Sequence, residues 1–364
     1  MFPLLRHAGS IFWKRRPIQL TFFVTRKCNA RCPFCFYLRS TDHPEDDAEE
    51  LTLDEIRKIS RSLGRLLWLA FSGGEIYLRK DLVEVSRIFH AQNRPAIMLY
   101  PTNGLLPELI RDRTEQILEH CPGSVVVVKL SLDGLRADHD ALRETPGGFD
   151  KVMESYRLLG ELLDRYPNFE LGINTVFCSE NQDRMGEIIE FVQGLEYVRT
   201  HTVSLARGNL SNAHYKNVDY RKYRDATERL EKNLRNKTSS FYRFRGARLK
   251  AAQDILQRRL IHQTALQQKR LTPCYAGRLN LVLAESGGVY PCEMLAESLG
   301  NVRDFNYDLK QILRSGPAQA VMRRIGENRC HCTHECYFIT NILFNPRQYP
   351  ALAKEYMQLR KGDM

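Results

Sequence analysis

The chain has 364 residues, 43% of them hydrophobic and 27% charged. This composition is typical of a folded globular protein and excludes a disordered, collagen-like or coiled-coil chain. Lys and Arg exceed Asp and Glu by 54 to 43, which gives a net charge of +11, and ten cysteines are too sparse for a secreted disulfide scaffold. The sequence has neither a secretory signal nor the ~18 to 20 consecutive apolar residues of a membrane-spanning helix, so we expect a cytoplasmic protein.

Residues 1–17 form an N-terminal extension that mixes apolar and basic side chains. Phe12 and Trp13 stand directly before Lys14, Arg15 and Arg16. Such a segment is able to lie on a membrane surface. The simpler expectation is a short helix packed on its own domain, with peripheral membrane contact as the alternative.

Strand-like and helix-like segments alternate between residues 18 and 210. Helical patterns of 10 to 15 residues between strands predict a parallel sheet with right-handed crossovers. The strand candidates are 18–25, 66–72, 96–104, 124–134, 171–177 and 197–206, and the helix candidates are 51–63, 82–91, 107–119, 149–165 and 182–194. Six repeats predict an α/β fold with an open, TIM-like (β/α)6 partial barrel rather than a complete eight-stranded barrel.

The pattern changes after the sixth strand candidate. Residues 211–270 are mostly helical and polar, and the segment 221–278 holds 16 Lys and Arg against four Asp and Glu. Residues 271–340 contain five cysteines and a predicted hairpin, which indicates a small α+β domain, and residues 341–364 form a helical tail. The excess positive charge of the chain is therefore concentrated between the barrel and the cysteine-rich domain.

Three cysteines follow the first strand candidate as Cys28-x3-Cys32-x2-Cys35. Three thiolates on one loop hold three irons of a [4Fe-4S] cluster and leave the fourth iron without a protein ligand. An open coordination position is what metal-centred chemistry requires. The alternative is a structural zinc site, although zinc sites favour two C-x2-C pairs.

This triplet, with Phe34 before its last cysteine, resembles the signature of the radical S-adenosylmethionine (SAM) enzymes. The resemblance implies that the open iron binds SAM. It also implies that a reductant such as a flavodoxin or ferredoxin drives cleavage of SAM to a 5′-deoxyadenosyl radical, which abstracts a substrate hydrogen atom.

Polar motifs recur at the ends of later strand candidates, where a parallel barrel places its active site. Residues 72–75 read Ser-Gly-Gly-Glu, residues 102–104 read Thr-Asn-Gly, and residues 131–134 read Ser-Leu-Asp-Gly. These motifs resemble the SAM-binding elements of the same family. Including Phe34, the resemblance implies cofactor contacts from Gly73, Gly74, Glu75, Asn103, Ser131, Asp133, Arg143, Asn174 and Arg207.

The cysteines of the tail form a second group. Cys274 and Cys292 flank the predicted hairpin, and the other three stand as Cys330-x-Cys332-x3-Cys336. The group resembles the SPASM/twitch extensions of radical SAM enzymes, which implies one auxiliary [4Fe-4S] cluster for electron transfer. Five thiols exceed the four ligands needed, so one of Cys330, Cys332 and Cys336 is left over. A structural zinc site is the alternative.

Two cysteines lie outside both groups. Buried free cysteine is the default interpretation for each of them. Cys178, just past the fifth strand candidate, is a candidate catalytic hydrogen-atom donor if it faces the barrel interior.

These patterns predict an enzyme that abstracts a hydrogen atom from an unactivated C–H bond of a peptide side chain or of a small or lipid-like metabolite. One alternative is a non-enzymatic iron–sulfur or zinc scaffold that binds nucleic acid through residues 221–278, since phosphate contacts and stacking would use its basic and aromatic residues. Another is a radical SAM enzyme that modifies RNA. No RNA-binding module is recognisable, so we favour a peptide or small-molecule substrate.

Overall fold

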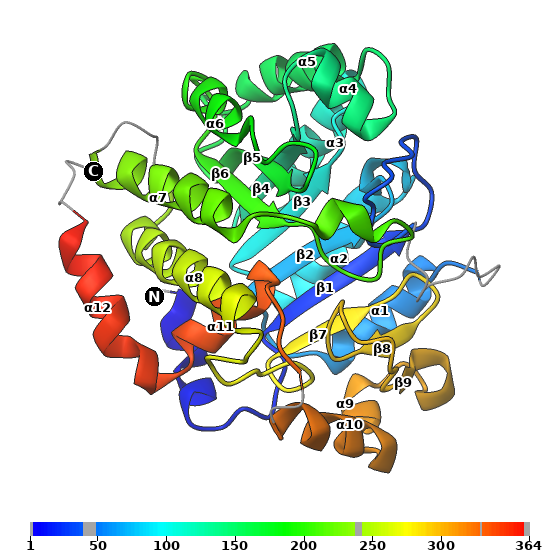
Figure 1. The fold of residues 1–364 in the computed structure, drawn as a ribbon. Helices are drawn as coiled ribbons and strands as arrows, with labels where there is room; N and C mark the ends of the chain where they lie inside the picture. The colour runs from blue at the N-terminus through cyan, green and yellow to red at the C-terminus, as the bar shows by residue number, and fades with distance from the viewer. Residues whose placement is uncertain (1–2, 39–48, 237–241, 328–329, 360–364) are drawn as a thin grey trace.

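The computed structural model describes residues 3–38, 49–236, 242–327 and 330–359. The ends of the predicted N-terminal extension and helical tail, residues 1–2 and 360–364, lie outside this set. Within it, one sheet has the strand order β6-β5-β4-β3-β2-β1-β7-β8-β9 (Figure 1). Its first six strands are β1 Gln19–Thr25, β2 Trp68–Gly73, β3 Ile97–Thr102, β4 Val125–Ser131, β5 Phe169–Phe177 and β6 Thr200–Leu205.

These six strands are all parallel, and each lies beside the next one in sequence. Helices on the outer side connect them: α1 Leu53–Ser62, α2 Leu82–Asn93, α3 Pro107–His120, α4 Ala137–Arg143, α5 Gly148–Gly160 and α6 Met185–Gln193. The start of α1 is fixed by the expected capping box between Thr52 and Glu55. The predicted α/β partial barrel is confirmed, and α4 is an additional short helix.

The strands of the cysteine-rich region continue the same sheet. These strands are β7 Asn280–Leu283, β8 Gly288–Tyr290 and β9 Gly300–Asn301. Strand β7 runs parallel to β1, with Gln19 opposite Asn280 and Phe22 opposite Leu283, and β8 returns antiparallel to β7 as the predicted hairpin. The barrel and the cysteine-rich region therefore share one hydrogen-bonded sheet, although helical segments separate them in sequence.

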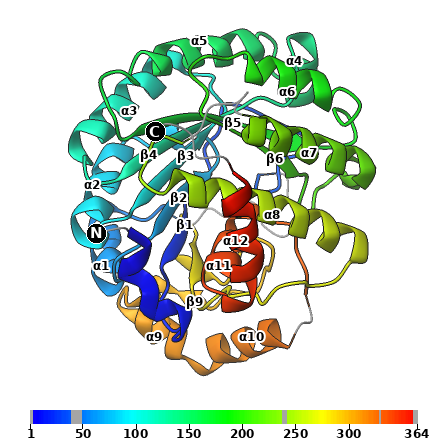
Figure 2. The same cartoon turned by 90° about the vertical axis from the view of Figure 1, so that its left-hand side faces the viewer.

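Helices that follow β6 cover the side of the barrel that six strands leave open (Figure 1). They are α7 Tyr220–Asn236, α8 Ala247–Gln267, α11 Glu335–Leu343 and α12 Tyr349–Gln358. Helices α9 Leu309–Arg314 and α10 Gly316–Gly326 lie elsewhere, where α9 packs against α10, η4 Val302–Phe305 and α1. Helix α8 packs against α7, α11 and α12 (Figure 2). The short 3-10 helices are η1 Pro3–Ile11, η2 Ile76–Leu78, η3 Ala213–Lys216, η4 Val302–Phe305 and η5 Pro346–Gln348.

The N-terminal extension is only partly packed on the fold. Ile11 contacts a buried cluster that includes Ile18, Leu279 and Phe344, whereas Phe12 and Trp13 are largely exposed. Among the described residues, no helix combines the length and apolar character required to cross a bilayer.

Candidate active site

The three cysteines of the first triplet lie on the loop that leaves β1, and all three line one large cavity. The Sγ of Cys28 accepts a hydrogen bond from the amide of Ala30 at 3.5 Å, and the Sγ of Cys35 accepts one from Leu38 at 3.3 Å. Burial, followed by the charges of Glu75 and of the other two thiols, raises the pKa of Cys28 to about 11. Burial also raises the pKa of Cys32. Thiols with raised pKa values deprotonate fully only beside a cation, which is the behaviour of metal ligands.

Gly73 and Gly74 pack the end of β2 against this loop. A Cβ at Gly73 would lie 2.3 Å from the carbonyl oxygen of Thr25, and one at Gly74 would lie 2.2 Å from that of Lys27. The amide of Gly74 donates to Thr25, and the amide of Glu75 donates to Lys27, both at 2.8 Å. The close approach that requires glycine is thus made to the protein's own backbone, and it fixes the path of the thiol loop.

The carboxylate of Glu75 is buried and already has three donors. It accepts from the hydroxyl of Thr102 at 2.8 Å, the amide of Asn103 at 2.7 Å and the amide of Tyr77 at 3.2 Å. Burial raises the pKa of Glu75, and these hydrogen bonds oppose that rise. Asn103 in turn donates to Asn29 at 2.8 Å and lies 3.9 Å from the Sγ of Cys28. Glu75 therefore positions the end of β3 against the thiol loop.

Asp133 and Arg143 form a buried ion pair at the ends of β4 and α4. The Nε of Arg143 lies 2.8 Å from Oδ2 of Asp133, whose Oδ1 accepts from the amide of Val176 at 2.7 Å. Burial lowers the pKa of Arg143, but the nearby Cys32 and Asp133 raise it by more. A fixed cation thus stands beside the cysteine loop, where it is able to hold a carboxylate.

Asp133 is fully buried and does not line the cavity, whereas the remaining predicted cofactor contacts do line this cavity. Its lining includes Phe34, Ser131, Asn174 and Arg207. Cys178 is an exception among the predicted site residues, because it is fully buried in a small apolar cluster with Phe34, Leu142 and Leu210 and is not part of the cavity lining. Burial raises the pKa of its thiol to about 12, which fits a structural cysteine.

The second group of cysteines divides into four and one. Burial raises the pKa of Cys292, and the charges of Cys332 and Cys274 raise it further. Burial likewise raises the pKa of Cys332, and the charges of Cys274 and Cys330 add to that rise. Arg270 donates to the Sγ of Cys330 at 3.0 Å. These four cysteines therefore lie near one another, and none of them lines the cavity.

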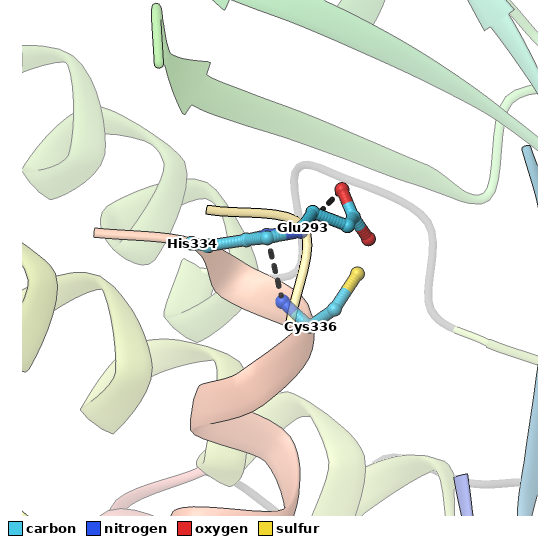
Figure 3. Close-up of side chains that lie close together, drawn as sticks. All are labelled: Glu293, His334 and Cys336. Carbon is cyan, nitrogen blue, oxygen red and sulfur yellow. Dashed lines mark hydrogen bonds and ion pairs between the residues drawn. The ribbon is translucent and has the colours of Figure 1, made fainter. Parts of the chain in front are cut away.

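Cys336 stands apart from those four and lines the cavity. Its Sγ and the side chains of Glu293 and His334 place their ligand atoms within 4.8 Å of one another (Figure 3). The Nε2 of His334 lies 2.7 Å from Glu293, and Arg207 lies 3.6 Å from the same carboxylate. Burial and Arg207 lower the pKa of His334, but Glu293 raises it by more, which favours the protonated imidazole. Arg207 and protonated His334 thus form an ion-pair network with Glu293 that competes with a metal ion. The sequence had marked His331 and His334 as possible substitute ligands because they lie between the last three cysteines, but it gave no signal for Glu293.

The basic segment 221–278 directs much of its charge into the protein. Arg259 pairs with Glu231 and Glu355, and Arg243 donates to the carbonyls of Leu163 and Phe169. Other cations of the segment, on α8, line the cavity. The charge excess is thus partly a set of internal contacts rather than a uniformly solvated face.

Known proteins resemble this chain in sequence, and the resemblance includes the region that carries the site. Residues 22–192 match the radical SAM superfamily. The chain is 25% identical over 299 residues to the AdoMet-dependent heme synthase of Methanosarcina barkeri, covering 79% of this chain and 80% of that one. It is 30% identical over 205 residues to the GTP 3′,8-cyclase of Helicobacter pylori, covering 51% and 57%. The sporulation killing factor maturation protein SkfB of Bacillus subtilis is 26% identical over 174 residues, covering 48% and 39%.

Solved structures share the fold at lower identity. Native anSMEcpe with bound AdoMet superposes with a TM-score of 0.58 at 16% identity, covering 94% of this chain and all of that one. Streptococcus suis SuiB bound to precursor peptide SuiA superposes with a TM-score of 0.59 at 15% identity, covering 88% and 69%. Apart from the heme synthase, the chain spans only 57% of the GTP 3′,8-cyclase and 39% of SkfB.

The barrel and its thiol loop thus form a radical SAM domain, the type of domain that uses a [4Fe-4S] cluster and SAM. Residues 22–192 of the chain belong to the radical SAM superfamily, and the protein is an enzyme of that class. Its membership speaks against the alternative of a non-enzymatic scaffold.

Proposed function

We propose that this protein removes a hydrogen atom from an unactivated C–H bond of a substrate held inside the partial barrel. The observation that carries the proposal is the continuity of one cavity, of about 390 Å³, from the thiols of Cys28, Cys32 and Cys35 to the interior faces of the strands. Ligand sites in proteins commonly have volumes of about 300 to 1,000 Å³.

Different residues of the chain would hold the iron–sulfur cluster and SAM. Cys28, Cys32 and Cys35 would ligate three irons of the first cluster. Asn103, held by Glu75, and the pair of Asp133 and Arg143 would hold the polar groups of SAM, together with Phe34, Gly73, Gly74, Ser131, Asn174 and Arg207. When bound, these cofactors supply a 5′-deoxyadenosyl radical on one-electron reduction, with the electron coming from a flavodoxin or ferredoxin.

A second cluster would be held by Cys274, Cys292, Cys330 and Cys332. Four thiolates satisfy all the irons that need protein ligands, which suits electron transfer rather than substrate binding. Cys336 would then be the cysteine left over, because its charged neighbours are Glu293 and Arg207 rather than another thiol.

A peptide side chain and a small or lipid-like metabolite are both candidate substrates. The names of relatives support the peptide: they include a PqqA peptide cyclase, and SuiB was solved with a precursor peptide. The buried position of the cavity between the strands and α8 supports a small molecule or a single side chain.

Anaerobic reconstitution tests the proposal. The intact protein should bind about eight irons per chain, four for each cluster, and should cleave SAM in the presence of dithionite. The triple variant, in which Cys28, Cys32 and Cys35 are all changed to Ala, should lose SAM cleavage while keeping the second cluster. Cys121→Ala, which removes a buried thiol outside both groups, is the matched control. Cleavage retained by the triple variant would overturn the mechanism.

A further inference from the structure

The cavity extends away from the thiol loop into a region that we call the lower chamber. It is lined by Lys129 on β4, Thr200 and Thr202 on β6, and Lys250, Asp254 and Arg258 on α8. None of these residues belongs to a predicted cofactor contact. A buried lysine inside a barrel is uncommon, because removing an ammonium group from water is costly unless partners compensate it.

The fold makes specific room for this lysine. The Nζ of Lys129 donates to the hydroxyl of Thr200 and, at 3.1 Å, to that of Thr202. On the intervening strand β5, a Cβ at Gly172 would lie 2.8 Å from the Nζ and 2.5 Å from the Thr200 hydroxyl. A glycine at the centre of a strand weakens the strand, and it is expected where another group must approach closely. Gly172 therefore makes space for the ammonium group.

Cations outnumber anions in this chamber. Lys250 and Asp254 pair with each other, and no carboxylate of the described residues lies within ion-pair distance of Lys129 or Arg258. Arg258 donates through Nη2 to the carbonyl of His201 at 3.3 Å, and its buried Nη1 has no hydrogen-bond partner among the described residues. Burial, followed by the charges of Lys129 and Arg258, lowers the pKa of His201 to about 3, as a positive field would.

Another part of the lining of the same space is apolar. Side chains at alternate positions of three neighbouring strands point into the barrel. They are Trp68 and Ala70 on β2, Ile97 and Leu99 on β3, and Val127 on β4. The lower chamber therefore offers hydrophobic surface on one side and unneutralised cations on the other.

We propose that the lower chamber binds an amphipathic organic anion, with its carboxylate or phosphate group between Lys129 and Arg258 and its apolar body against Trp68, Ile97 and Leu99. An anion would supply the charge that the chamber lacks and the hydrogen-bond acceptor that Arg258 lacks. This assignment rests on the proposed function, since it names the substrate class for the same cavity. The C–H bond to be attacked would belong to the end of the molecule nearer the thiol loop.

Binding to the reconstituted protein tests this assignment without turnover. The protein carries both clusters and SAM under anaerobic conditions, and no reductant is added. The probes are 4-phenylbutyrate, phenyl phosphate and the neutral 4-phenylbutanamide, with affinities measured by isothermal titration calorimetry. At least one anion should bind ten-fold or more tightly than the amide. Whichever anion binds more tightly identifies the headgroup as carboxylate or phosphate.

Matched variants locate the binding. Lys129→Gln keeps a polar side chain of similar length, and Arg258→Gln removes the second cation, so each should weaken anion binding about ten-fold and leave the amide unchanged. Lys151→Gln, on the exposed surface of α5, is the control and should change nothing. Iron content and far-UV circular dichroism verify that each variant is folded and loaded.

Three results would overturn the assignment: no anion binds the intact protein, the amide binds as tightly as the anions, or neither Lys129→Gln nor Arg258→Gln weakens binding. Failure of the proposed function is a different result, because loss of SAM cleavage would leave anion binding in the unreduced protein intact.

Discussion

The two ends of the cavity differ in how completely their charges are satisfied. At the end that carries Cys28, Cys32 and Cys35, Glu75 has three donors and Asp133 and Arg143 form a buried pair. In the lower chamber, Lys129 and Arg258 have hydroxyl and carbonyl acceptors, but the described part of the chain places no carboxylate within ion-pair distance of either. The first end is organised before any ligand arrives, whereas the second gains its missing partner only from a ligand. This difference suits a cofactor that stays bound at the first end and a substrate that enters and leaves at the second.

The largest expected effect concerns which cysteines ligate the second cluster, the one proposed for Cys274, Cys292, Cys330 and Cys332. Cys332→Ala should remove about four of about eight irons, because it deletes one ligand of a [4Fe-4S] cluster. Cys336→Ala, only four positions further on, should keep the full complement. Iron analysis and electron paramagnetic resonance after anaerobic reconstitution measure both. Loss of a cluster in Cys336→Ala would return that cysteine to the ligand set.

A second prediction tests how much the buried pair of Asp133 and Arg143 stabilises the cofactor end, by which we mean the end of the cavity that carries Cys28, Cys32 and Cys35. Asp133→Asn leaves Arg143 buried without its counter-ion, which should cost about 3 to 5 kcal/mol of unfolding free energy. The control is Glu161→Gln, which breaks the exposed pair with Arg157 and should cost less than about 1 kcal/mol. Anaerobic urea unfolding followed by circular dichroism compares them. Equal losses would show that the buried pair contributes no special stability.

A third prediction concerns the space that Gly172 provides. Gly172→Ala would push a methyl group into the Lys129 ammonium and the Thr200 hydroxyl, so overpacking should cost about 1 to 3 kcal/mol and weaken binding of 4-phenylbutyrate several-fold. SAM binding, measured by equilibrium dialysis, should not change. Gly64→Ala has no heavy atom within 4 Å of the new Cβ and serves as the control. Unaltered anion binding in Gly172→Ala would contradict the role given to Lys129.

A fourth prediction concerns the pH dependence of anion binding. Burial lowers the pKa of Lys129 to about 7; Asp254 opposes the shift, Lys250 and Arg258 add to it, and Glu170 opposes it. An anion binds the charged form, so affinity should be full below about pH 6 and fall about ten-fold between pH 6 and pH 8.

The neighbouring groups do not reverse this sign. Burial raises the pKa of Glu170 to about 7, so its ionisation adds negative charge over the same interval, and His201 remains neutral. Lys129→Gln should flatten most of the profile in calorimetric titrations at several pH values. A profile that stays as steep in Lys129→Gln would assign the titration to Glu170 instead.

The cofactor end could be predicted from the sequence because each of its motifs is contiguous. The cysteine triplet, the glycine pair with Glu75, and Asp133 each follow a strand of a parallel sheet, and such strands bring their ends together. The register of β7 beside β1 had no such signal, since two segments some 260 residues apart must meet. The hairpin itself was recognisable, but its pairing partner was not.

The lower chamber could not be predicted for a related reason. Lys129 reads as one residue of a valine-rich strand, Arg258 as one charge in a basic helix, and Gly172 as an ordinary strand glycine. Their common function arises only when β4, β5 and α8 pack together. Cys336 shows the opposite case, because its spacing grouped it with the tail cysteines while the start of α11 places it with Glu293 and His334.

The pairing of β7 with β1 has a consequence for any attempt to divide the chain. With β7 in place, β1 has a hydrogen-bonded neighbour on both sides. A fragment that ended before residue 271 would present the backbone N–H and C=O groups of β1, a strand rich in Phe and Val, as an open edge. Exposed edges of this kind join to other chains. The cysteine-rich region therefore also acts as a cap against self-association, whatever chemistry its thiols perform.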